Sequence, residues 1–187
     1  SPLPGLTFRE SLYNGVASDR INRQFRFCPR SDGMFNIGSL SYHIGEEDRH
    51  HGYYAVGYAL GSSPSETSAD KTFNYALWTL IEQPLLHVGE SHLGAMWQGG
   101  TSPASRSTCR HYWGAGLSWS NIPPQMTQVG LVVNRALYAD GRETDVELTG
   151  SFPVCNHFTL QPAVHCINTN GNYTAAAQLR AILEFGN

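Results

Sequence analysis

The chain has 187 residues and a formal net charge of −3, and only 14% of its residues are charged. This composition excludes the clustered basic surface that nucleic-acid binding needs, and no run of about eighteen apolar residues encodes a transmembrane helix. The mean hydropathy of −0.30 does not exclude a membrane β-barrel, because half of the strand residues of such a barrel face water.

Ten segments with strand-like patterns follow one another along the chain, separated by stretches rich in Gly, Pro, Asn, Ser and charge. They lie at residues 5–13, 34–44, 52–60, 72–82, 91–98, 112–120, 127–137, 143–152, 158–167 and 175–185. No segment shows a helical period over three turns. The pattern therefore predicts an all-β fold of about ten strands.

The last three segments alternate apolar and polar residues most clearly. In the eighth segment, Val146 and Leu148 alternate with Asp145 and Glu147, so one face of the strand is apolar and the other polar. Segments of about ten residues suit tilted strands that cross an outer membrane. We therefore predict a single domain, residues 1–187, that forms an antiparallel outer-membrane β-barrel or part of a larger one. A soluble β-sandwich gives the same alternation and stays open at this point.

Four polar residues are predicted to line the water-filled side of the barrel: Glu82, Glu147, Gln161 and Arg180. Charges opposed across a lumen orient polar solutes and exclude apolar ones. The separators at 62–71 and 99–110 are long and those at 87–90 and 154–157 short, which is typical of barrels with short turns at one end and longer loops at the other.

Aromatic and histidine side chains have two interpretations each. Trp78, Trp97, Trp113 and Trp119 are candidates for stacking on sugar rings if they face the lumen. The girdle at a membrane interface is the favoured interpretation for Trp113 and Trp119, whereas Trp78, which shares a polar row with Asn74 and Glu82, fits either interpretation. His165, on a polar row, is predicted to be a hydrogen-bonding lumen residue. The adjacent His50 and His51 are predicted to lie on a solvated loop, and no metal site or cofactor is expected.

The chain contains four cysteines, which permit two disulfides in an oxidising compartment. They are Cys28, Cys109, Cys155 and Cys166. The sequence does not determine their pairing.

An ordered series of motifs resembles the later strands of one known family. The motifs are Gly33-Met-Phe-Asn-Ile-Gly, Gly52-Tyr-Tyr-Ala-Val-Gly-Tyr, Tyr75-Ala-Leu-Trp-Thr-Leu-Ile-Glu-Gln-Pro-Leu, Trp113-Gly-Ala-Gly-Leu, Glu143-Thr-Asp-Val-Glu-Leu-Thr, Leu160-Gln-Pro-Ala-Val-His and the closing strand to Phe185. Together they resemble the C-terminal portion of the OprB-type carbohydrate-selective porins. The resemblance covers most of the chain and is most specific after residue 140.

This resemblance implies a protein of the bacterial cell outer membrane that is not an enzyme and has no cofactor. Its partners would be sugars or small polar solutes, which pass by diffusion, and outer-membrane lipid. An alternative is a non-conducting structural or interaction subunit, derived from a porin, that binds another envelope protein or barrel segment.

Overall fold

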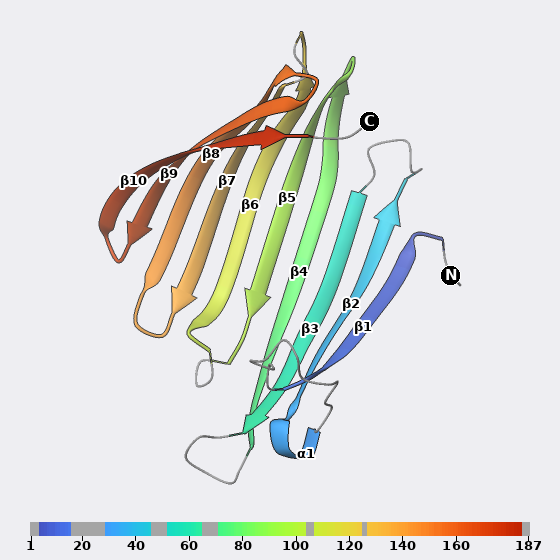
Figure 1. The fold of residues 1–187 in the computed structure, drawn as a ribbon, viewed down its shortest axis with the longest axis vertical. Helices are drawn as coiled ribbons and strands as arrows, with labels where there is room; N and C mark the ends of the chain where they lie inside the picture. Colours follow the sequence, from blue (N-terminus) through green and yellow to red (C-terminus); the bar gives the residue numbers. More distant parts are fainter. Residues whose placement is uncertain are drawn as a thin grey trace.

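The computed structural model describes residues 4–15, 29–45, 52–64, 71–103, 107–124 and 127–184. Ten strands form one sheet in which each strand pairs antiparallel with its neighbours in sequence (Figure 1). The strands are β1 (Leu6–Asn14), β2 (Met34–Ile44), β3 (Gly52–Pro64), β4 (Lys71–Val88), β5 (Ser91–Thr101), β6 (Cys109–Ile122), β7 (Thr127–Tyr138), β8 (Arg142–Cys155), β9 (Phe158–Thr169) and β10 (Asn172–Leu183). A single helical turn, α1 (Pro29–Asp32), precedes β2.

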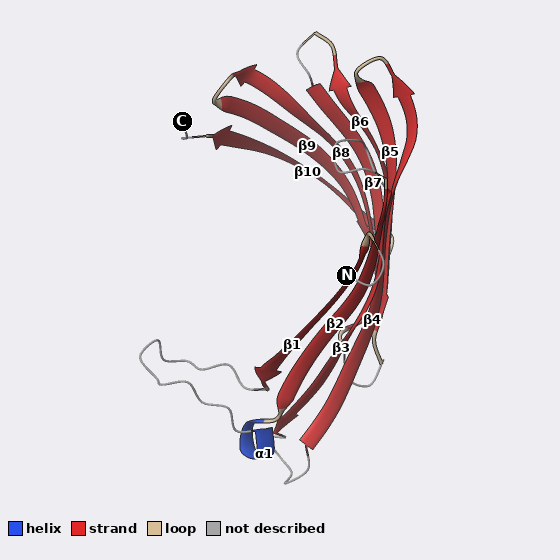
Figure 2. Cartoon of the chain, turned by 90° about the vertical axis from the view of Figure 1, so that its right-hand side faces the viewer, coloured by secondary structure: helices blue, strands red, loops and turns tan. Residues whose placement is uncertain are grey.

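The sheet curls into a deep arc when it is viewed along its edge (Figure 2). Within the described residues, β1 and β10 are its two edges and pair with no further strand. The prediction of an all-β, antiparallel fold of ten strands is confirmed, and each predicted segment contains a strand. In the part of the chain that the structure describes, no helix has the length and apolar character needed to cross a bilayer.

Short turns set the register of the C-terminal hairpins. Asn170 and Gly171 both have positive φ, 54° and 96°, and connect β9 to β10 so that Thr169 lies opposite Asn172. Two-residue turns with positive φ match the twist of antiparallel strands, and Asn-Gly is the sequence that favours them. The turn thus fixes which side chains of β9 and β10 share a face.

The main difference in strand bounds is at β4, which continues to Val88 instead of ending at residue 82. The register shifts between Pro84 and Leu86, so the strand continues past proline through a bulge. A proline cannot donate to the sheet, and a bulge is one place where a sheet tolerates it. Phe185, the predicted aromatic end of the last strand, lies outside the described residues.

The connections are less uneven than the sequence suggests. The segments 65–70 and 102–108 are long, and the turns 89–90 and 156–157 at the other end of the sheet are short. The connections 139–141 and 170–171, at the same end as 65–70 and 102–108, are also short, and 45–51, at the end of the short turns, is as long as 102–108. The two ends of the sheet therefore do not divide into short turns and long loops.

Three of the four cysteines are described, namely Cys109, Cys155 and Cys166, and all three are free thiols. Cys28 lies outside the described residues. No disulfide therefore connects the described strands, which are held by the backbone ladders and the contacts between side chains.

Candidate functional site: a two-faced sheet wall

The strand register divides the side chains into an apolar face and a polar face. On the apolar face, each strand presents a large hydrophobic side chain that is between 41% and 68% exposed. One from each strand in order is Phe8, Leu40, Val56, Leu77, Trp97, Leu117, Leu131, Leu148, Val164 and Leu179. Monomeric soluble proteins rarely expose an apolar patch larger than a few hundred Å². We call this surface the convex face, because it lies on the outside of the arc.

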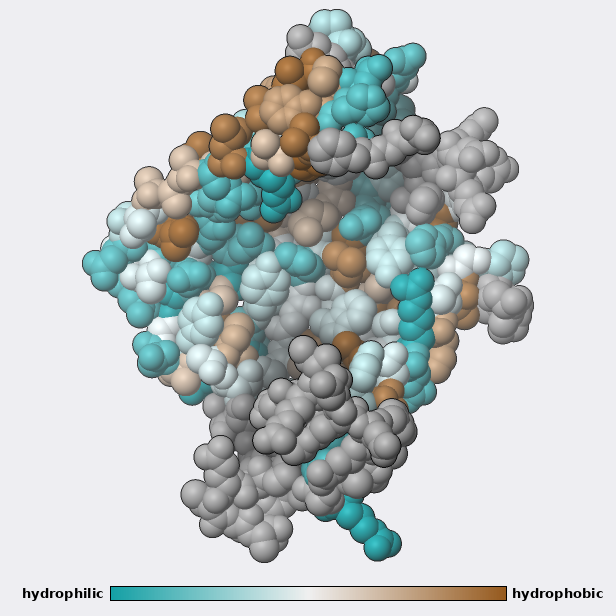
Figure 3. Space-filling model, viewed as in Figure 1, coloured by the Kyte–Doolittle hydropathy of each residue, from teal (hydrophilic) through white to brown (hydrophobic). Residues whose placement is uncertain are grey.

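The opposite, concave face carries small and polar residues. Ala55 and Ala163 are buried there at 4% and 3% exposure, and hydrophilic and intermediate residues cover most of the coloured centre of this face (Figure 3). Small residues on the inside of a curved sheet leave room where side chains from neighbouring strands converge. The predicted alternation of Val146 and Leu148 with Asp145 and Glu147 in the eighth strand agrees with this register.

The apolar side chains on the convex face follow the hydrogen-bonded rows of the sheet. Leu117, Leu131, Leu148 and Val164 are direct partners in one such row across β6–β9. A parallel row on the same face contains Arg135, Thr144 and Asn168, so a polar border lies at the same level on β7, β8 and β9.

A polar island interrupts the convex face at β1–β3. The Asn36 amide donates to Glu10 Oε1 at 3.1 Å, and the Tyr58 hydroxyl donates to the same oxygen at 3.2 Å. The Tyr58 ring lies over Gly38, where an added Cβ would come within 2.6 Å of ring atoms. The Glu10 carboxylate is thus held by two donors on an otherwise apolar surface.

All four predicted lining residues lie on the concave face. Gln161 lies directly opposite Arg180 on β9 and β10, and Glu147 lies directly opposite His165 on β8 and β9. Glu82 belongs to the same hydrogen-bonded row as Glu147, but β5, β6 and β7 separate the two. The four residues therefore share one face of the sheet but do not form one cluster.

A hydrogen-bonded group that the sequence analysis missed connects β5, β6 and β7. The Gln98 amide donates to the Tyr112 hydroxyl at 2.6 Å, and that hydroxyl donates to Asn134 Oδ1 at 2.7 Å. Gly114 lies between Gln98 and Asn134 in the register, and a Cβ there would come within 2.4 Å of Asn134 Oδ1. The absence of a side chain at Gly114 therefore lets the three polar groups meet.

Asn134 lies opposite Asp145 in the register, and His165 Nδ1 lies 3.2 Å from Asp145 Oδ2. This contact confirms the prediction that His165 is a hydrogen-bonding residue of the polar face. The turn at Asn156 and His157 is the signal in the sequence that could have found it, because a short hairpin there brings residues 147 and 165 opposite each other.

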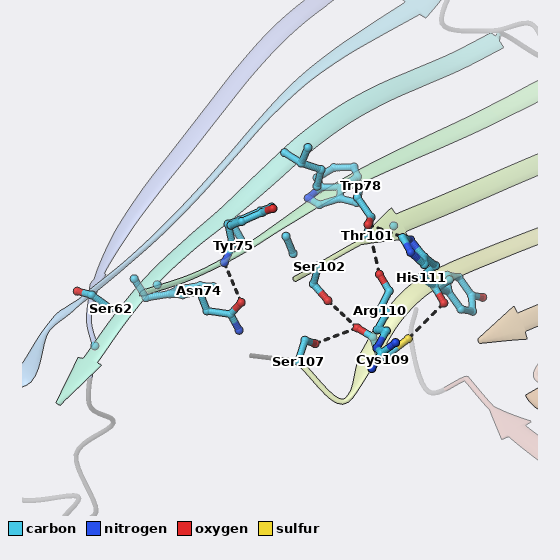
Figure 4. Close-up of a pocket in the computed structure, with 18 of the residues that line it drawn as sticks. Ser62, Asn74, Tyr75, Trp78, Thr101, Ser102, Ser107, Cys109, Arg110 and His111 are labelled. Carbon is cyan, nitrogen blue, oxygen red and sulfur yellow. Dashed lines mark hydrogen bonds between the residues drawn. The ribbon is translucent and has the colours of Figure 1, made fainter. Parts of the chain in front are cut away.

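A hollow of about 620 Å³ lies at the end of the sheet where β3 leads to β4 and β5 leads to β6. Trp78, Asn74 and Arg110 are among the residues that line it (Figure 4). The Thr101 hydroxyl lies 3.0 Å from His111 Nδ1 at its border. The volume falls in the range of small-ligand pockets, and the lining combines an aromatic ring with several polar groups.

The tryptophans divide between the two faces. Trp97 and Trp119 are 41% and 50% exposed on the convex face, and Trp97 stacks on Trp113 with 5.9 Å between ring centroids. Trp113 and Trp119 therefore lie on the face where a membrane girdle was predicted. Trp78 lies on the concave face, where its ring covers Gly57. The predicted solvated histidines His50 and His51 lie outside the described residues.

Comparison with known proteins adds no relative: no family model, no curated protein sequence and no solved structure matches this chain.

Proposed function

We propose that this sheet is the wall of a bacterial outer-membrane β-barrel of the carbohydrate-porin kind, which passes sugars or small polar solutes by diffusion. The observation that carries the proposal is the exposed apolar convex face, to which every strand contributes a large hydrophobic side chain. An exposed apolar face on an antiparallel sheet, with a polar face behind it, is the arrangement of a membrane barrel wall. The resemblance to the OprB-type porins supports the same assignment.

The polar lining supports passage of polar solutes. Glu147, Gln161 and Arg180 present both signs of charge and an amide on the concave face, and Trp78 adds a ring on which a sugar can stack. The hollow of about 620 Å³ beside Trp78 has room for a monosaccharide with its hydration water. Substitutions on such a lining are expected to alter selectivity more than stability.

The proposal includes partner strands at β1 and β10. In lipid, each unsatisfied backbone group costs several kcal/mol, so both edges must be paired. Closure of ten strands alone gives a narrow tube filled by side chains, whereas aqueous channels have about sixteen or more strands. Further strands at the two edges, from another segment or another copy, would widen the lumen enough for sugars.

The same two edges favour a second function, a non-conducting interaction subunit of an envelope complex. Liposome swelling separates the two functions. Protein folded into vesicles, with heat-modifiable gel mobility as the control for folding, should cause swelling in glucose. If folded protein causes no swelling, the porin function is refuted and the function as a non-conducting interaction subunit is supported. Recovery of folded protein from a detergent-free soluble fraction would contradict both.

A further inference from the structure

Three potential metal ligands converge on the concave face of β8 and β9. Asp145 and Glu147 are two residues apart on one strand and therefore share a face, and Glu147 lies directly opposite His165. One ligand atom from each of the three side chains lies within 4.8 Å of the others. The hairpin thus brings two carboxylates and an imidazole to one place.

The cluster is incompletely satisfied by the residues around it. Asp145 Oδ1 has no solvent contact and no hydrogen-bond partner, although leaving a buried acceptor unpaired is costly. The side chains of His165 and Asp145 are only 19% and 21% exposed. Among the described residues, no lysine or arginine forms an ion pair with Asp145 or Glu147, and Asp145 pairs only with the His165 imidazole, at 3.2 Å.

We propose that Asp145, Glu147 and His165 bind a divalent transition-metal ion of the Zn²⁺ class. Imidazole and carboxylate together suit Zn²⁺, Co²⁺ or Ni²⁺, whereas Ca²⁺ and Mg²⁺ prefer oxygen ligands alone. A tetrahedral ion holds its ligand atoms about 3.3 Å apart, so small side-chain rotations complete the site. Water on the open side of the sheet supplies the remaining ligands.

The neighbouring thiol takes no part in this site. Cys166 follows His165 in the sequence but lies opposite Val146 on the convex face, so the sheet separates it from the cluster. The site therefore has nitrogen and oxygen ligands only. Its existence does not depend on solute passage, because the ion would cross-link β8 and β9 in either proposed function.

Titration of the full folded chain in detergent micelles with Co²⁺ tests this proposal through the visible absorption of the bound ion. We expect one Co²⁺ per chain, displaced by Zn²⁺, without the charge-transfer absorption of a thiolate ligand. Asp145→Asn, Glu147→Gln and His165→Gln preserve shape and should each weaken binding by more than about tenfold, since even indirect partners of metal ligands change affinity by about 10–100-fold.

The control is a double substitution, His87→Ala with His92→Ala, of two histidines outside the cluster whose ring centroids are 6.1 Å apart. It should leave Co²⁺ binding unchanged. The assignment would be overturned if each of the three single variants bound Co²⁺ as tightly as the native chain. It would also be overturned if Co²⁺ binding were lost on substitution of His87 and His92, or on alkylation of the cysteines.

A second measurement needs no variant. Zn²⁺ should protect His165 of the native chain from acylation by diethylpyrocarbonate, read by mass spectrometry of the peptides. Equal modification of His165 with and without Zn²⁺ would also overturn the site.

Discussion

Replacement of Leu148 by arginine distinguishes a convex face in lipid from one in water. Leu148 is 54% exposed near the centre of the apolar run of β8. If this face met water, the substitution would change the free energy of unfolding by no more than about 0.5 kcal/mol. At the midplane of a bilayer, arginine costs about 2–4 kcal/mol, and we expect a loss of stability of this size.

The matched control is Thr144→Arg on the same strand and the same face, next to Arg142. Thr144 lies four residues from Leu148, about 13 Å along the strand and, at the tilt of about 35–45° that barrel strands have, about 10 Å in height. That distance places Thr144 near the interface, where the cost of arginine falls to about 0–1 kcal/mol.

Urea unfolding of vesicle-bound protein, followed by tryptophan fluorescence, measures both variants. We expect Leu148→Arg to be less stable than Thr144→Arg by about 1–4 kcal/mol. Losses that agree within about 0.5 kcal/mol would refute the reasoning, because depth in a bilayer would then have no effect.

Three further predictions concern the concave lining and the tryptophans. Gly57→Ala should lower the free energy of unfolding by about 1–3 kcal/mol, because its Cβ would lie 2.2 Å from the Trp78 ring. The control Gly94→Ala, whose Cβ has its nearest contact at 3.5 Å, should leave the free energy of unfolding unchanged. Equal losses in the two variants would contradict the assigned packing. Arg180→Gln should reduce anion preference in bilayer conductance while the unfolding midpoint stays constant; unchanged selectivity would remove Arg180 from the lining. In single-tryptophan variants, brominated acyl chains should quench Trp119 more strongly than Trp78, and the reverse order would contradict the assignment of the faces.

Much of the fold was predictable because the alternation of apolar and polar residues has the period of a strand. In the eighth segment the alternation assigned Leu148 and Glu147 to opposite faces, as the register shows. The continuation of β4 to Val88 was not predictable, because Pro84 is ordinarily a sign that a strand ends, and a bulge is needed to continue past it.

The concave clusters were predictable only in part. The face of each side chain follows from its own strand, but contacts such as Tyr112 with Asn134 depend on the register between strands. That register is set by turn geometry. The cluster of Asp145, Glu147 and His165 was missed for the same reason, since no close spacing in the sequence unites the three residues.

The most direct test of a lipid-facing convex surface is the accessibility of nitroxide labels placed one at a time along residues 145–152 of the vesicle-bound chain. Labels at Val146, Leu148 and Phe152 should collide with oxygen dissolved in lipid, and labels at Asp145 and Glu147 with a water-soluble nickel chelate. Alternation with a period of two residues is the predicted result. Equal access of the nickel chelate to both sets of positions would contradict the membrane wall.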